Sequence, residues 1–544
     1  MKEKKNLCSS IFKQKTNIKI YNHVMKRYHL GILSLGLGMM LASCNSGSGD
    51  KGILSGVSDM FDSGLSEESL QKALQSGASL DSTVYKRAGV IQSEIATLYQ
   101  KRGNKPLWID GKSISEKGKK AIASIGKLGL DGLDPQRYEF EKLQQALNAK
   151  ESTEDNLAST EVLLTRSLAL AASDLTFGLL NPAEVDKEWH SDNDSVFSFA
   201  EILQSDSLSK DNVLDAFRPA NPRYALMQQE MEKWGRLKSD TAYMKYKDLV
   251  KSGSLSVLPD LIRKEIHSDD ADSALIKSYQ YLNHLSTTGK IDEELIKTAK
   301  RNPDDYITQL KINMERMRWL PNKMNDHYIW VSIPQAEIDY YKGGHNLFHN
   351  RTIVGSRTNR TPSLLKPMQN IVICPPWGVP LSIVGKEYGG RIPAKYEVYR
   401  GGKRVPNSMV NAGNYKQFAV RQPPGPAAAL GYVKFNLPNK WDIYLHDTPG
   451  RSLFANKVRY MSHGCVRVKE PRVLASLILE SQNIGIDSIN TMIKKNRTTP
   501  INTDKIPVYI SYFTANADST MKNMLYLSDP YRKDSVLIQK LALK

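Results

Sequence analysis

The stretch WDIYLHDTPGRSLFANKVRYMSHGCVRV, residues 441–468, joins a strand-like pattern to a polar, glycine-bearing turn. In its first part, apolar residues alternate with Tyr444 and His446, so a strand would place these two rings on one face. Cys465 follows nineteen positions after His446, inside Ser-His-Gly-Cys. The pattern predicts a strand, a polar loop and a turn that carries a thiol.

A thiol and an imidazole at this spacing suit nucleophilic catalysis. Cys465 is the candidate nucleophile and His446 the candidate base, because thiol attack needs a group that accepts the thiol proton. Gly464 lets the backbone approach a substrate closely, as the N–H groups of an oxyanion hole require. The alternative is a buried cysteine with two packed histidines, but a polar Ser-His-Gly-Cys turn is a poor apolar core segment.

The turn also resembles the signature of the L,D-transpeptidase catalytic domain. That signature is a histidine, a mid-length loop, and Ser/Thr-His-Gly-Cys followed by an apolar residue and Arg or Asn. The matching residues are His446, Ser462, His463, Gly464, Cys465, Val466 and Arg467. The resemblance implies acyl transfer through a Cys465 thioester, from a tetrapeptide stem of peptidoglycan to an amine of another stem. It implies that the backbone carbonyl of Asp447 orients His446, and it implies no cofactor.

Further residues are candidates for substrate binding. Arg467 and Arg421 could pair with stem carboxylates, although a structural salt bridge is an equal alternative for each. Tyr444 and Trp377 could line the pocket or belong to the core. Ser462 and His463 belong to the same candidate set, and both could instead support the loop.

Other functions stay open at this point. If water accepts the acyl group, the enzyme is an L,D-carboxypeptidase. A non-catalytic lipoprotein that binds peptidoglycan is the alternative from another class. A Cys374–Cys465 disulfide would remove the nucleophile. No metal is expected, because a structural zinc site needs four ligands and no second cysteine pair accompanies His463 and Cys465.

The N-terminal residues resemble a lipoprotein signal. Lys26 and Arg27 precede an apolar run from Leu30 to Ala42, which is too short to span a bilayer but suits a signal peptide. Leu-Ala-Ser-Cys ending at Cys44 resembles the bacterial lipobox, whose cysteine is lipidated. We therefore expect a signal peptide at 1–44, with residues 1–24 as a possible over-extended start, a flexible tether at 45–64, and a lipid-anchored protein of the periplasm.

Length and charge are consistent with an envelope protein of several domains. The chain has 544 residues and a net charge of +18, which favours anionic surfaces such as cell wall or lipid headgroups. The positive charge is dispersed and no motif that reads nucleic acid is present, so we expect no nucleic-acid partner.

The order of patterns predicts an α+β multidomain protein. Helical spacing dominates residues 65–260, which resemble the N-terminal scaffold of the large periplasmic L,D-transpeptidases. Residues 261–302 resemble a degenerate peptidoglycan-binding helical module, and 303–323 read as a connecting helix. Short alternating runs predict a β-sandwich-like catalytic domain at 324–500, with a capping lid at 382–416 that is poor in strand pattern. Residues 501–544 are expected to form a C-terminal extension without chemistry.

Overall fold

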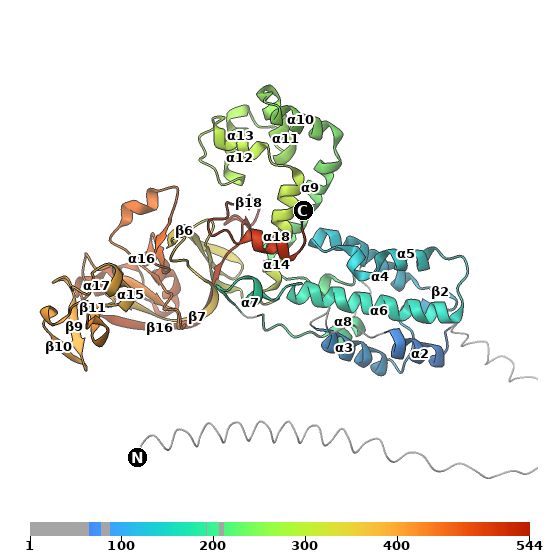
Figure 1. The fold of residues 1–544 in the computed structure, drawn as a ribbon, viewed down its shortest axis with the longest axis horizontal. Coiled ribbons are helices and arrows are strands. Elements are labelled where there is room, and N and C mark those ends of the chain that lie inside the picture. Colours follow the sequence, from blue (N-terminus) through green and yellow to red (C-terminus); the bar gives the residue numbers. More distant parts are fainter. Residues whose placement is uncertain (1–64, 78–86, 192, 206–210, 544) are drawn as a thin grey trace, which may run out of the picture. The chain divides into compact units, whose positions relative to one another are not determined.

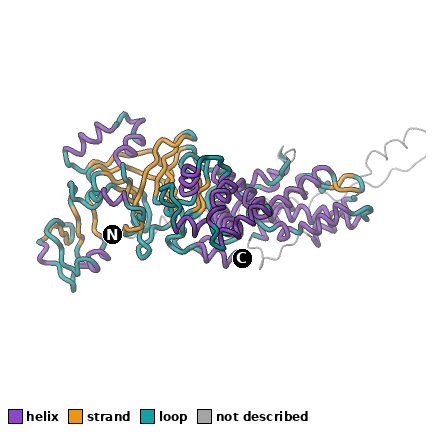
Figure 2. Tube along the Cα trace, turned by 90° about the horizontal axis from the view of Figure 1, so that it is seen from above, coloured by secondary structure: helices purple, strands orange, loops and turns teal. Residues whose placement is uncertain are grey.

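The structure, a computed structural model, describes residues 65–77, 87–191, 193–205 and 211–543. The expected signal peptide, Cys44 and the tether at 45–64 lie outside these residues. Helices make up most of the chain up to residue 318, and strands are gathered after residue 326 (Figure 1 and Figure 2). This arrangement confirms the α+β class. In the described ranges, no helix combines the length and the apolar character that crossing a membrane would require.

The first helical group is built around α6. Its helices are α2 Glu67–Gly77, α3 Ala88–Lys101, α4 Glu116–Gly126, α5 Phe140–Asn148 and α6 Glu154–Phe177. Helix α6 is buried on most sides, as expected of a helix with apolar and small residues all round. Its buried Glu161 carboxylate accepts hydrogen bonds from the backbone N–H groups of Leu107, Trp108 and Ile109. The turn before α4 is thereby fixed to the central helix.

A second helical group follows. Its elements are α7 Pro182–Val185, β3 Trp189–His190, α8 Phe199–Gln204, α9 Pro222–Ser239, α10 Thr241–Lys251, α11 Leu258–Ile266, α12 Asp272–Leu282, α13 Glu293–Ala299 and α14 Pro303–Arg318. Figure 1 shows α10 to α13 clustered at the end of α9.

The boundary predicted between residues 260 and 261 is wrong, because it cuts through α11. The ammonium group of Lys247 in α10 bonds the Glu265 carboxylate in α11 at 2.6 Å, and both side chains are buried. Leu261, Tyr279 and Leu295, from α11, α12 and α13, share one apolar core with α9 and α10. Short amphipathic helices cannot cover their apolar faces alone, so residues 261–302 pack with the helices before them.

The strands of the C-terminal part form one large sheet. They are β4 His327–Ser332, β5 Glu337–Lys342, β6 His345–Gly355, β7 Ser363–Ile373, β12 Val433–Asn436, β13 Leu445–His446, β15 Val466–Val468 and β16 Thr499–Ser511. Neighbouring strands follow the order β12-β13-β15-β6-β5-β4-β16-β7, with β3 at the end, and β14 Tyr460–Ser462 pairs with β6. Because β12 also pairs with β7, the sheet closes on itself.

Strand β16 overturns the predicted end of the catalytic domain at residue 500. It pairs with β4 in parallel and with β7 in antiparallel orientation, inside the closed sheet. Val508 and Ile510 lie in the apolar core of the sheet. The remaining elements are β17 Ala515–Ala517, β18 Met524–Tyr526 and α18 Asp534–Lys540. The sheet therefore needs residues that were assigned to the C-terminal extension.

The segment between β7 and β12 folds as a small unit with its own sheet. Its elements are β8 Trp377–Val379, α15 Leu381–Lys386, β9 Glu397–Arg400, β10 Lys403–Val405 and β11 Ala419–Gln422, and the sheet order is β10-β9-β11-β8. Residues 382–416 therefore contain two strands, which the glycine-rich sequence does not predict. Gly401 and Gly402, both with positive φ, form the turn that joins them. Val398, Phe418 and Val420 belong to a separate apolar core.

Candidate active site

Cys465 lies in the turn between β14 and β15, and the turn is held by side-chain hydrogen bonds. The Ser462 hydroxyl donates to the Cys465 carbonyl at 2.6 Å and accepts the Gly464 N–H at 3.1 Å. Gly464 has φ +116°, a backbone conformation that favours glycine. The Thr361 hydroxyl donates to the Gly464 carbonyl at 2.7 Å. Three hydrogen bonds of two hydroxyl groups thus set the backbone next to the thiol.

The Cys465 N–H is a free backbone donor of this turn. Within the described residues it has no hydrogen-bond acceptor, whereas the Gly464 N–H, which we expected to line the oxyanion hole, is taken by Ser462. The Gly464 carbonyl and the Cys465 N–H belong to one trans peptide plane and point in opposite directions. Since the carbonyl points to Thr361, the N–H points away from Thr361 and stays free for an oxyanion.

The strand register brings the predicted base to the face of the thiol. Strands β13 and β15 are parallel neighbours, with Leu445 opposite Val466 and His446 opposite Arg467. Facing residues in adjacent strands point to the same side of a sheet, and every second residue shares a side. The His446 imidazole and the Arg467 guanidinium therefore share one face, and Cys465, in the turn just before β15, is close enough to act on the pKa of Arg467.

His446 is oriented by the backbone of the next residue. Its Nδ1 lies 2.5 Å from the Asp447 carbonyl oxygen, so Nδ1–H is the donor and Nε2 is free to accept a proton. The side chain is only 5% exposed. Burial, followed by the charges of Arg467 and Lys434, lowers the pKa of His446 to about 3, against the effect of the Asp447 carbonyl. The resting imidazole is neutral.

The Asp447 side chain holds this backbone in place. Its carboxylate accepts hydrogen bonds from the Tyr432 N–H at 2.9 Å and from the Arg451 guanidinium at 2.7 Å. A Cβ on Gly431 would lie 2.4 Å from the Asp447 carboxyl carbon, so only glycine fits there. The orienting carbonyl thus belongs to a buried residue that is bonded on two sides.

The Cys465 thiol is protonated at rest. Burial raises its pKa, and contacts with Tyr444 and the charge of Lys434 act in the opposite direction. Sγ lies 3.4 Å from the Asp442 carbonyl oxygen, which can accept the S–H bond. The thiol and the imidazole are therefore both neutral at rest, so nucleophilic attack requires the thiol proton to move. The structure records no bridge to Cys374, because both cysteines are free thiols.

Tyr444 and Trp377 lie beside the thiol. The Tyr444 ring is 5.6 Å from the His446 ring, and Cys465 and Trp377 are both close enough to act on the pKa of Tyr444, in opposite directions. Trp377 reaches this point from β8, in the small sheet. Both aromatic side chains are half-buried, so they line the site without belonging to the closed core.

The remaining predicted residues, Ser462, His463 and Arg421, lie in three different environments. Ser462 is buried, and both hydrogen bonds of its hydroxyl are made to backbone groups of the turn. His463 is exposed, and its Nε2 lies 2.7 Å from a Glu387 carboxylate oxygen, just after α15. Arg421 lies on the exposed face of β11, opposite Glu397 of β9, and in the described ranges it has no contact with the thiol turn.

Sequence reasoning missed Lys434. In β12 it lies directly opposite His446, and its ammonium group is 4.1 Å from the centre of the Tyr444 ring. In the part of the chain that the structure describes, neither Lys434 nor Arg467 forms an ion pair with a carboxylate. The only signal in the sequence is a lysine inside an apolar strand pattern, Val-Lys-Phe, which does not reveal the strand that it faces.

Comparisons with known proteins agree with this architecture. Residues 326–507 match the L,D-transpeptidase catalytic domain, and residues 93–231 match a Scaffold domain. A curated protein of Haemophilus influenzae named "Putative L,D-transpeptidase" is 35% identical over 246 residues, which are 42% of this chain and 49% of that protein. The chain thus spans about half the length of the curated relative that it matches.

Two solved structures are also similar to parts of the chain. The NMR structure of the catalytic domain of E. faecium L,D-transpeptidase acylated by ertapenem is 12% identical, covers 35% of this chain and 99% of that one, and has a TM-score of 0.19. The structure of the Ldtfm–avibactam carbamoyl enzyme is 13% identical, covers 35% and 51%, and has a TM-score of 0.18.

Proposed function

Since residues 326–507 match the L,D-transpeptidase catalytic domain, we propose that the protein cross-links peptidoglycan stems by acyl transfer through Cys465. The observation that supports the proposal is the β13–β15 register, in which His446 is opposite Arg467, two residues after Cys465. The free Nε2 of His446 and the free N–H of Cys465 supply the two groups that thiol acyl transfer needs.

The first half-reaction forms a thioester. The Cys465 sulfur attacks the carbonyl carbon of the peptide bond that follows the third stem residue, while the thiol proton passes to His446 Nε2. The oxyanion of the tetrahedral intermediate accepts the Cys465 N–H. The C–N bond then breaks, His446 returns the proton to the leaving amine, and the terminal D-residue departs.

The second half-reaction transfers the acyl group. The side-chain amine of another stem attacks the thioester carbon and gives a proton to His446. The C–S bond breaks, and the sulfur takes the proton back as a thiol. One peptide bond is broken and one is formed, so no cofactor or oxidant is required. If water attacks in place of the amine, the product is a shortened stem.

Two unpaired cations favour a substrate that carries carboxylates. Lys434 and Arg467 flank His446 on neighbouring strands, and among the described residues neither forms an ion pair, although the Asp442 carboxylate is close enough to oppose the lowering of the Lys434 pKa by burial. Half-buried cations without a counter-ion attract anionic groups, and arginine can bind a carboxylate through two parallel hydrogen bonds. We assign both to the carboxylates of the donor stem.

Trapping the thioester tests the proposal. A carbapenem is expected to acylate the purified protein once, at Cys465, with the adduct found by peptide mass spectrometry. Cys465→Ala removes the adduct, and Cys374→Ala, a matched change at the other described cysteine, keeps it. An adduct that persists in Cys465→Ala, or none in the wild-type protein, contradicts the proposal.

Muropeptide analysis distinguishes the three outcomes for the stem. Cross-linked 3-3 dimers after incubation with peptidoglycan indicate transpeptidation, whereas tripeptides alone indicate a carboxypeptidase. Sacculi that bind the protein without any change in their muropeptides indicate a binding lipoprotein. We expect dimers that disappear in both Cys465→Ala and His446→Gln.

We also propose that the protein is anchored to a membrane of the bacterial envelope through Cys44. The support is the lipobox-like Leu-Ala-Ser-Cys and the apolar run before it. Metabolic labelling with a fatty acid is expected to mark the wild-type protein and to fail in Cys44→Ala.

A further inference from the structure

Tyr531 is linked to the catalytic turn by an unbroken path of hydrogen bonds. Its hydroxyl donates to the Gly355 carbonyl at 2.6 Å and accepts the Thr361 N–H at 3.3 Å. The Thr361 hydroxyl accepts the Gly355 N–H at 2.8 Å and donates to the Gly464 carbonyl at 2.7 Å. Tyr531 and Thr361 are both fully buried, so water does not compete for these bonds.

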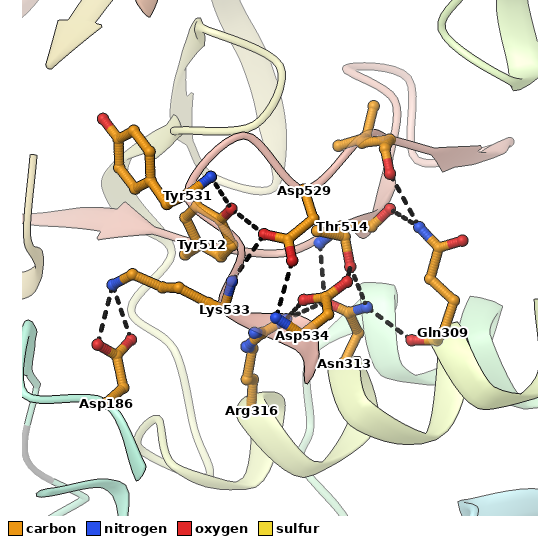
Figure 3. Close-up of polar contacts among 11 residues, drawn as sticks. Asp186, Gln309, Asn313, Arg316, Tyr512, Thr514, Asp529, Tyr531, Lys533 and Asp534 are labelled. Carbon is orange, nitrogen blue, oxygen red and sulfur yellow. Dashed lines mark hydrogen bonds and ion pairs between the residues drawn. The ribbon is translucent and has the colours of Figure 1, made fainter. Parts of the chain in front are cut away.

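Tyr531 is itself fixed by the segment around it. Its backbone N–H donates to the Tyr512 hydroxyl at 2.8 Å, and that hydroxyl donates to the Asp529 carboxylate (Figure 3). The rings of Tyr531 and Tyr512 are stacked, with their centres 5.4 Å apart. Asp529 also accepts the backbone N–H groups of Lys533 and Asp534, each at 2.9 Å. The hydrogen bonds of the Asp529 carboxylate thus hold the backbone of segment 529–534.

Ion pairs connect this segment to α14 and to the residue that follows α7. The Asp534 carboxylate accepts the Arg316 guanidinium of α14 at 2.7 Å and the Thr514 hydroxyl at 2.7 Å. The Lys533 ammonium group contacts both Asp186 carboxylate oxygens at 2.9 Å, just after α7 (Figure 3). Ion pairs buried on both sides leave the segment little freedom to shift.

The loop between β6 and β7 connects Tyr531 to the thiol turn. A Cβ on Gly355 would lie 2.3 Å from the Asn359 carbonyl oxygen, so the glycine lets residues 356–361 fold back on β6. This loop conformation brings the Thr361 hydroxyl within hydrogen-bond distance of the Gly464 carbonyl. Because the peptide between Gly464 and Cys465 is planar and trans, fixing the carbonyl also fixes the direction of the Cys465 N–H.

We propose that Tyr531 and Thr361 are positioning residues for the oxyanion hole, and that the C-terminal segment 529–534 is part of the catalytic apparatus. This inference rests on the proposed acyl transfer at Cys465. The two residues touch no substrate. They act by aiming the unpaired Cys465 N–H at the position where the oxyanion forms, and a shift of about 1 Å at such a donor can lower a rate on the order of 100-fold.

The test compares two reactions of the same thiol. Carbapenem acylation forms an oxyanion, whereas alkylation by iodoacetamide forms none and needs only the thiol and its base. In Tyr531→Phe and Thr361→Val we expect the acylation rate constant to fall about 10- to 100-fold, with alkylation near the wild-type rate. Thr361→Ser keeps the hydroxyl and is expected to restore acylation.

Ser511→Ala is the matched control for lost stability. Its buried hydroxyl donates to the Val331 carbonyl at 3.0 Å inside the sheet, with no link to the thiol turn. We expect this variant to be destabilised like Tyr531→Phe and to keep its acylation rate. Equal losses of acylation and alkylation in Tyr531→Phe, or unchanged acylation, would overturn the inference.

Hydrogen exchange tests the inference independently of any acylation. Mass spectrometry of the peptide that spans residues 460–468 is expected to show faster exchange in Tyr531→Phe than in Ser511→Ala. Equal exchange in the two variants contradicts the positioning role. A wild-type protein that no carbapenem acylates overturns the proposed function, while the exchange result still decides whether Tyr531 orders the turn.

Discussion

Lys434 of β12 is the cross-strand partner of His446 of β13, so a lysine ammonium group lies on the face that carries the His446 imidazole. The same ammonium group contacts the Tyr444 ring at 4.1 Å. A cation at this place disfavours an imidazolium ion beside it, and it favours a bound carboxylate. We therefore predict that the lysine affects both the proposed base and the binding of a carboxylate-bearing substrate.

Lys434→Met should change the pH profile and the affinity together. Without the ammonium charge, the pKa of His446 rises, so the acid limb of the acylation profile moves to higher pH. We expect KM for a carboxylate-bearing stem to rise about tenfold, which corresponds to one lost ionic hydrogen bond. Lys434→Arg should keep most of the affinity, and Lys495→Met, at an exposed lysine, should change neither quantity. An acid limb that does not move would exclude the lysine from the control of His446.

His446 makes the fold sensitive to acid. Its pKa is about 3 in the folded protein and about 6.5 in an unfolded chain, so the unfolded chain binds more protons between these values. Stability is complete above pH 6.5 and is lost as the pH falls through this window, by about 2 kcal/mol between pH 6.5 and 5. Denaturant titrations at both pH values should show a smaller loss for His446→Gln than for the wild-type protein. Equal losses would show that other groups cause the acid sensitivity.

Gly464→Ala should slow acylation strongly without unfolding the domain. At φ +116° an alanine is strained, and its Cβ would lie 3.3 Å from Ile443 Cδ1 and 3.4 Å from the Arg360 carbonyl oxygen. The backbone would relax by turning the Gly464 peptide, at a cost of about 1–3 kcal/mol, and the Cys465 N–H would leave its position. We expect a loss on the order of 100-fold in the carbapenem acylation rate, with an unchanged circular dichroism spectrum. Gly485→Ala, a glycine with open space around it and an extended φ of −82°, is the control.

Glu387→Gln tests whether the small sheet acts as a cap on the site. The Glu387 carboxylate lies 2.7 Å from Nε2 of His463, the exposed histidine of the thiol turn. Because both side chains are exposed, the pair stabilises by about 0–1 kcal/mol and is weakened by salt. We expect a few-fold change in KM for polymeric peptidoglycan, abolished at high salt, and no change in the acylation rate by a small carbapenem. A change for the carbapenem alone would show that the contact serves the thiol turn and not a cap.

The buried Lys247–Glu265 pair tests the unity of the second helical group. Lys247→Met leaves a buried carboxylate without its cation, which should cost about 3–5 kcal/mol in the free energy of unfolding. The double variant Lys247→Met, Glu265→Leu should recover much of this loss. Chemical denaturation measures both values, and a wild-type-like stability of the single variant would mean that α10 and α11 fold independently.

Much of the site was readable in the sequence because its signal is local. His446 and Cys465 lie at the ends of a single stretch, and Ser-His-Gly-Cys names the residues of one turn. The orienting carbonyl belongs to Asp447, the residue next to His446. Alternation and helical spacing are likewise local, so they predicted the α+β class and most of the strands from β4 to β7.

The sequence did not reveal the supports of the site, because these come from distant strands and loops. Lys434 is brought opposite His446 by a strand pairing. Thr361, 103 positions before Gly464, bonds the Gly464 carbonyl, and Tyr531 of the C-terminal segment bonds the Gly355 carbonyl of the same network. Pairing partners depend on which strands close the sheet, and no local pattern encodes that choice.

By itself, the sequence determined the chemistry of the turn: a thiol, an imidazole twenty residues or so earlier, and a glycine where the backbone needs positive φ. Only the tertiary structure decided which groups surround them. The sheet closes by pairing β12 with β7 and by inserting β16 between β4 and β7. Closure of the sheet therefore set the register that placed Lys434 beside His446. The C-terminal segment packs near the thiol turn because buried polar groups there need hydrogen-bond partners that only distant residues supply.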